Sequence, residues 1–155
     1  AAGNTDGGTV DGTVRMRLGS PRPTQAQDVL NLALIGAEGA IFVGALDGNG
    51  TVDNPASIAS YSTIAGNNVD VQDMYLVVGV EDGVTNLAGT SFAAPIVTGY
   101  AAILGDKFEM ATPGQIVDQL LVTAREDTIQ GYSVSIHGQG EASLINALSP
   151  LSIPN

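Results

Sequence analysis

Two short apolar segments most constrain the fold of this chain. Residues 40–46 (AIFVGAL) and 75–80 (YLVVGV) are continuous apolar runs, and each ends at acidic and glycine residues, Asp47-Gly48 and Glu81-Asp82-Gly83. A short apolar run that stops at turn residues is typical of a strand buried on both faces, as in a parallel sheet. We therefore expect an α/β fold in which helices cover a mostly parallel sheet on both sides.

Two helices are predicted from periodicity and composition. Residues 112–125 carry apolar residues at helical spacing behind a capping box of Thr112 and Gln115, with Pro113 in the first turn. Residues 93–104 are apolar nearly all round. Such a pattern predicts a helix that is buried on all sides.

The remaining elements are predicted from weaker patterns. Thr24 and Gln27 fit a capping box at the start of a helix over Thr24–Ile35. A short strand is expected at Thr13–Leu18, where apolar residues alternate with arginines. Residues 51–73 have no clear period and are expected to be irregular.

Charge and composition exclude several classes of function. The 155 residues suffice for one domain and contain 16 Asp and Glu against five Lys and Arg, a net charge of −11. Nucleic acids and anionic membrane surfaces are bound through Lys and Arg, so neither is an expected partner. The chain has no cysteine, which excludes disulfides and thiolate chemistry. No apolar run reaches the roughly 18 residues of a membrane span.

A serine-containing stretch follows the second apolar run. Gly89-Thr90-Ser91-Phe92-Ala93-Ala94-Pro95 opens the predicted buried helix and puts Ser91 at or near its N-terminus. Free N–H groups and the positive end of the helix dipole gather there, and both favour a serine alkoxide and an oxyanion. Gly-Thr-Ser alone would equally fit a helix-capping serine.

The same stretch resembles the serine motif of the subtilisin-like serine proteases, the subtilase family. The likeness continues through residues 96–104, and the segments 1–4, 40–47, 59–62 and 132–150 agree with it. Val77-Val78-Gly79 departs from the Ala-Pro-Gly that is usual in the family. The resemblance covers the C-terminal half of the family's catalytic domain and implies a subtilisin-like three-layer fold. It leans toward bacterial secreted and autotransporter-type members.

The resemblance also implies roles for individual residues. Ser91 would be the nucleophile, and Asn4 would be the oxyanion-hole asparagine, whose NH₂ donates beside the Ser91 N–H. The alternative for Asn4 is an ordinary turn asparagine. The substrate-binding residues implied by the family are Ala1, Ala2, Gly3, Gly89 and Thr90.

The base that such a serine needs is not identified in this sequence. The family's aspartate and histidine motifs belong to the N-terminal half and have no match here. The single histidine, His137, falls at a structural turn of the family, and we expect it to be structural or solvent-facing. A sheet that started at Ala1 would also leave central strands unpaired. We therefore expect residues 1–155 to be the C-terminal part of a peptidase domain, completed by a companion N-terminal segment or a second copy.

These features predict a serine endopeptidase that hydrolyses peptide bonds through an acyl-enzyme. The resemblance implies peptide or protein substrates and a secreted or cell-surface location. The alternative is an inactive fragment, or pseudo-protease, that acts as a binding or structural module. No cofactor is identified. Members of the family often bind calcium. An EF-hand loop that began at Asp47 would need other residues at its fifth, sixth and twelfth positions, which are Thr51, Val52 and Ile58, so Asp47–Asp53 fits a plain turn.

Overall fold

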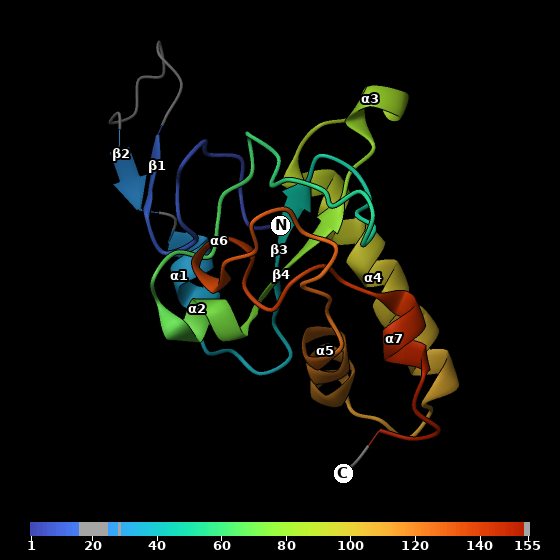
Figure 1. Ribbon diagram of the computed structural model, residues 1–155. Helices are drawn as coiled ribbons and strands as arrows, with labels where there is room; N and C mark the ends of the chain where they lie inside the picture. Colours follow the sequence, from blue (N-terminus) through green and yellow to red (C-terminus); the bar gives the residue numbers. More distant parts are fainter. Residues whose placement is uncertain (16–24, 28, 154–155) are drawn as a thin grey trace.

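The computed structural model describes residues 1–15, 25–27 and 29–153 (Figure 1). In chain order its elements are β1 (Thr13–Arg15), β2 (Gln25–Gln27), α1 (Val29–Leu34), β3 (Phe42–Leu46), α2 (Val69–Asp73), β4 (Tyr75–Gly79), α3 (Asp82–Thr85), α4 (Thr90–Lys107), α5 (Pro113–Val122), α6 (Val134–His137) and α7 (Leu144–Leu148). The two apolar runs are strands β3 and β4, as predicted.

The sheet is built around these two parallel strands, which pair along their full lengths. The edge of β4 away from β3 receives a later segment: Val77 N donates to Gly140 O at 2.9 Å, and Ala142 N donates to Val77 O at 2.8 Å. The edge of β3 away from β4 receives the start of the chain, where Ala2 N donates to Val43 O at 2.8 Å. Both edges of the strand pair are therefore used.

Alternate residues of β3 and β4 face two different layers. The first face packs against α4, α5 and α7 and consists of Val43, Ala45, Leu76 and Val78. The second face consists of Phe42, Leu46, Tyr75 and Val77, which pack against Ala2, Val10, Val71 and Ile129. Figure 1 shows α4, α5 and α7 on one side of the strand pair, and α2 and α6 on the other. The expected α/β architecture with parallel strands is confirmed.

The segment before β3 differs from its prediction. Gln25–Gln27 forms β2, which pairs antiparallel with β1, and the helix begins only at Val29. The backbone pairing with β1 outweighs the helical preference of these residues. The predicted strand over Thr13–Leu18 is confirmed for Thr13–Arg15. Its last three residues, and the expected cap Thr24, lie outside the described residues.

The capping box of α5 is confirmed. The Thr112 hydroxyl accepts a hydrogen bond from Gln115 N at 3.2 Å, and Gln115 Oε1 accepts from Thr112 N at 2.7 Å. Part of the region expected to be irregular forms α2 instead, where the Asn68 side chain caps the helix by accepting from Asp70 N at 3.0 Å.

The prediction that the helix over residues 93–104 is buried on all sides is wrong. In α4 the residues that face the strands are buried, whereas Phe92 is 39% exposed and Ile103 is 46% exposed. The strands and the helices α5 and α7 cover only part of the circumference of α4. Its other face keeps apolar side chains in contact with solvent.

Candidate active site

The start of the chain is held by hydrogen bonds from three other parts of the fold. Ala2 N donates to Val43 O in β3 at 2.8 Å, and the buried side chain of Asn31 donates to Ala2 O at 3.0 Å. Gly3 N donates to the hydroxyl of Thr90 at the start of α4, at 3.2 Å. These bonds place the segment that carries Asn4 against the N-terminus of α4.

Ser91 lies exposed in the first turn of α4. The N-cap is Gly89, with φ 129° and ψ 148°, a conformation that residues with a Cβ rarely adopt. Phe92 N donates to Gly89 O at 2.9 Å. The backbone N–H of Ser91 is one of the first four of the helix, which an α-helix leaves without an intrahelical partner. A solvent-accessible hydroxyl and an adjacent N–H donor therefore sit together at the positive end of a helix.

The side chain of Asn4 is oriented by Thr90. Its Oδ1 accepts from Thr90 N at 2.8 Å and from Thr90 Oγ1 at 3.0 Å. Because a backbone N–H only donates, the atom that faces it is the carboxamide oxygen. Asn4 Nδ2 consequently lies on the other side, where a Cβ added to Gly89 would come within 3.1 Å of it. Among the residues that the structure describes, Asn4 Nδ2 has no hydrogen-bond acceptor, so it can donate to a ligand.

The residues expected to bind substrate lie around this point with different exposures. Ala1 is exposed, Gly3 is half-buried, and Ala2, Gly89 and Thr90 are buried. The methyl group of Ala2 packs in the core, so Ala2 can meet a substrate only through its backbone. Their substrate-binding role stays a prediction.

His137 is buried in the fold, with 2% of its surface exposed. Its Nδ1 accepts from Ser133 N at 3.1 Å, and its ring stacks on Tyr132 at a centroid distance of 5.8 Å. Burial lowers the pKa of the imidazole below its ordinary value. The Ser133 carbonyl, 3.2 Å from Nδ1, can accept a hydrogen bond from the charged ring and opposes this only in part. These contacts fit the structural role expected for His137.

His137 also lies away from Ser91. Gln139, two residues after His137, donates its N–H to the carbonyl of Tyr75. Tyr75 is the first residue of β4, and its side chain lies on the second face of the strand pair. Ser91 follows the opposite end of β4 and belongs to a helix that covers the first face. The length of β4 alone separates the two ends by about 13 Å.

The sequence predicts no role for Thr63, which lies in the region of the site. Thr63 N donates to Gly3 O at 2.9 Å, and Thr63 Oγ1 accepts from Thr5 N at 3.1 Å, so Thr63 bonds to the residues on both sides of Asn4. Thr5 and Thr63 are 58 residues apart in the chain, so no local sequence pattern predicts the contact between them. The sequence signal in this region is the resemblance of Ser62–Gly66 to bacterial secreted and autotransporter-type members of the family, and it gives Thr63 no role.

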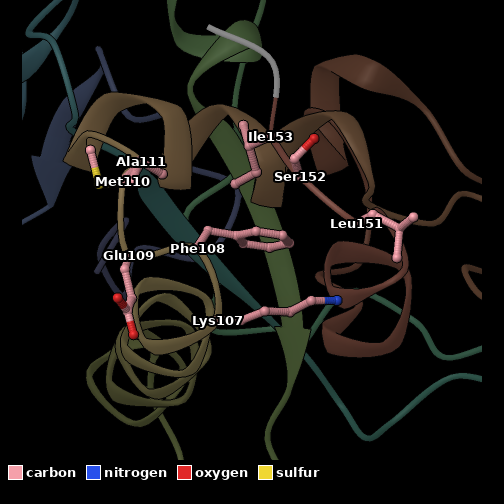
Figure 2. A pocket seen from close by; sticks show the side chains of 8 residues that line it. All are labelled: Lys107, Phe108, Glu109, Met110, Ala111, Leu151, Ser152 and Ile153. Carbon is pink, nitrogen blue, oxygen red and sulfur yellow. The ribbon is translucent and has the colours of Figure 1, made fainter.

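A cavity of about 320 Å³ lies elsewhere in the molecule (Figure 2). It is lined by residues 107–111 and 151–153, and its apolar members are Phe108, Met110, Ala111, Leu151 and Ile153. Lys107 ends α4, and the 16 residues from Ser91 to Lys107 span about 24 Å of helix. This cavity is therefore not part of the serine site.

Neither a metal-binding cluster nor a membrane-spanning helix occurs within residues 1–15, 25–27 and 29–153. No group of three or more His, Asp or Glu side chains in these ranges is arranged to hold a metal ion. None of the helices in these ranges is both long enough and apolar enough to cross a membrane. In the loop after β3, Asp47 Oδ1 accepts from Ser57 N at 2.9 Å.

Comparison with known proteins identifies the family of this chain. The family model described as the subtilase family, peptidase S8, matches residues 1–140. The chain is thus part of a serine peptidase domain. It belongs to the subtilase family, and its fold is the corresponding part of the subtilisin-like α/β fold.

Individual relatives are similar over part of their length. Serotype-specific antigen 1 of Mannheimia haemolytica is 34% identical over an alignment of 110 residues that covers 63% of this chain and 12% of that protein. Fervidolysin from Fervidobacterium pennivorans, described as a keratinolytic enzyme related to subtilisin, is 30% identical with a TM-score of 0.53, over 78% of this chain and 20% of fervidolysin. MycP1 from Mycobacterium smegmatis has a TM-score of 0.56 at 20% identity, over 99% of this chain and 43% of MycP1. The chain thus spans less than half the length of each.

Proposed function

We propose that this chain supplies the nucleophile and the oxyanion hole of a serine endopeptidase. Ser91 is the nucleophile, and Asn4 Nδ2 and the Ser91 N–H are the oxyanion donors. The observation that carries the proposal is the orientation of Asn4. Two hydrogen bonds from Thr90 fix its carboxamide oxygen, which leaves Nδ2 at the N-terminus of the helix that presents Ser91.

In the proposed reaction Ser91 Oγ attacks the carbonyl carbon of the scissile peptide bond and gives its proton to a histidine base. The carbonyl oxygen becomes an oxyanion and accepts hydrogen bonds from Asn4 Nδ2 and from Ser91 N–H. The C–N bond then breaks, and the leaving amine takes the proton from the histidine. Water repeats the sequence on the acyl-enzyme and releases Ser91.

The histidine and its orienting carboxylate are proposed to come from a companion N-terminal segment of the same protease or from a second copy of the chain. His137 is buried at the other end of β4, which argues against it as the base. The chain spans only 20% of fervidolysin and 43% of MycP1, which leaves room for such a segment. The apolar side chains of Phe92 and Ile103 on the open face of α4 offer it a contact surface.

Substrate and location belong to the same proposal. The substrates are peptides or proteins, whose backbone approaches Gly89 and Thr90 beside the small residues Ala1, Ala2 and Gly3. A secreted or cell-surface location is supported by kinship with fervidolysin, which is described as keratinolytic, because keratin fibres are too large to enter a cell.

A second candidate is a catalytically inactive module that acts by binding. The remote position of His137 favours it for the chain alone, since a serine without a base is a weak nucleophile. The two candidates differ in the reactivity of Ser91 rather than in the fold.

A fluorophosphonate probe separates them, because it reacts with a serine that a base has activated. We expect little labelling of the 155-residue chain alone and near-complete labelling, by intact mass, when the chain is part of a complete catalytic domain. The labelled peptide should contain Ser91, and Ser91→Ala should abolish labelling, whereas the control Ser143→Ala should not. An unlabelled complete domain with intact circular dichroism would support the inactive module.

A further inference from the structure

Thr63 is a buried residue whose polar groups are all engaged. Only 4% of its surface is exposed. Its N–H donates to Gly3 O at 2.9 Å, its hydroxyl accepts from Thr5 N at 3.1 Å, and its carbonyl accepts from Tyr75 Oη at 2.7 Å. Thr63 therefore connects the core to the segment that carries Asn4.

The contact with this segment is close. Gly3 has φ 119°, and a Cβ added there would lie 2.9 Å from Thr63 Oγ1. The hydroxyl of Thr63 thus rests on the backbone immediately before Asn4 and bonds to the N–H immediately after it. A backbone held on both sides of one residue leaves the Cα–Cβ direction of that residue little freedom.

Thr63 is itself held from inside the core. Tyr75 belongs to β4, is fully buried, and donates its hydroxyl to the Thr63 carbonyl. The neighbouring Ser62 hydroxyl donates to the same carbonyl at 3.2 Å and accepts from Ala45 N in β3 at 3.0 Å. The position of Thr63 is therefore tied to both strands of the sheet.

We propose that Thr63 is a positioning residue for the oxyanion hole, which acts on the reaction through Asn4. This inference rests on the proposed function. Thr90 fixes the rotation of the Asn4 carboxamide, whereas Thr63 fixes the backbone from which that side chain projects. A donor displaced by a fraction of an ångström loses its hydrogen bond in the transition state, where the bond has its effect.

The test compares three single variants in the complete, active protease. Thr63→Val keeps the shape and the backbone bonds but removes the acceptor for Thr5 N. We expect kcat to fall by about 10- to 100-fold with KM within about twofold of its original value. Thr63→Ser restores the hydroxyl and should recover most of kcat. The control Thr128→Val makes the same change at another buried threonine, whose hydroxyl has no partner among the described residues, and should leave kcat unchanged.

A double variant distinguishes positioning from general damage to the fold. If Thr63 acts through Asn4, the Asn4→Ala/Thr63→Val protein should be no slower than Asn4→Ala alone. Two outcomes would overturn the role of Thr63 and leave the proposed function standing. One is a fall in kcat in the double variant equal to the product of the falls in the two single variants, and the other is a normal kcat in Thr63→Val. A normal kcat in Asn4→Ala would instead overturn the assignment of Asn4, and the role of Thr63 with it.

Discussion

Asn4 and Thr90, which are 86 residues apart in the chain, are joined by two hydrogen bonds that both end on the carboxamide oxygen of Asn4. The Thr90 hydroxyl also accepts a hydrogen bond from Gly3 N, so it contacts both Asn4 and the residue before it. The oxygen of Asn4 is thus used inside the protein, and its NH₂ group is the part available for chemistry.

We predict that Asn4→Asp in the complete protease keeps the fold and loses the reaction. An aspartate can still accept both bonds from Thr90, but it has no NH₂ to donate and adds negative charge beside the oxyanion. The expected fall in kcat is at least about 100- to 1,000-fold, the loss that subtilisin itself shows without its amide donor. KM should change little, and the melting temperature should stay within a few degrees.

The control is Asn68→Asp, which adds the same charge at the N-cap of α2 and should leave kcat unchanged, because aspartate also caps helices. Wild-type kcat in Asn4→Asp, measured by steady-state hydrolysis of a peptide amide, would contradict the oxyanion role.

Gly44→Ala should destabilise the fold by about 1–3 kcal/mol. Gly44 is buried in the middle of β3, and an added methyl group would overlap the hydroxyl of Tyr75 and come within 2.7 Å of Tyr75 Cζ. The ring cannot turn away without breaking its bond to Thr63 O. Urea unfolding measures the change.

The matched glycine is Gly105, inside α4, where an added Cβ meets nothing within 4 Å. Gly105→Ala should raise stability by about 0.5–1 kcal/mol, because alanine favours the helix. If Gly44→Ala and Gly105→Ala changed the free energy of unfolding equally, the contact between Gly44 and the Tyr75 ring would not limit stability.

His137 should make the stability of the fold depend on pH between about 5.5 and 7.5. Burial lowers its pKa in the folded state, so the unfolded chain binds the proton first as the pH falls through about 6.5. The unfolded state then holds more protons, and the free energy of unfolding decreases as the pH falls. In His137→Asn this decrease should be smaller, as measured by urea unfolding at both pH values. The same decrease in both proteins would assign the effect to other groups.

Thr112→Ala should cost about 1 kcal/mol of stability, because it removes the acceptor for Gln115 N at the start of α5. Thr112→Ser keeps that acceptor and should remain close to the original protein in the same urea titration. A loss of similar size in both variants would point to the methyl group rather than to the cap.

The elements that could be predicted from the sequence are those specified by their own residues. β3 and β4 are apolar runs ended by turn residues, and α5 carries its cap and its apolar stripe within a few turns. β2 could not be predicted, because Gln25–Gln27 becomes a strand only through its pairing with β1. The exposed side chains of α4 show the same limit, since apolar composition does not reveal which faces of a helix are covered.

The residues of the site also fall into those that local sequence predicts and those that depend on distant contacts. The roles proposed for Ser91 and Asn4 are predicted from short motifs in which neighbouring residues carry the signal. The approach of Thr63 to the segment around Asn4 depends on how a distant loop crosses the sheet edge, and the sequence around Thr63 does not encode that crossing.

The bonds between the start of the chain and the start of α4 also have a consequence for the order of folding. They close a loop of more than 80 residues, and contacts of such high sequence separation form late because their entropy cost must first be met by other structure. We therefore expect Asn4 to be oriented only after the strands between these two segments have assembled. On the proposed roles of Ser91 and Asn4, a newly made or partly unfolded chain would have the serine but not the oriented amide, so reactivity of Ser91 would report that folding is complete.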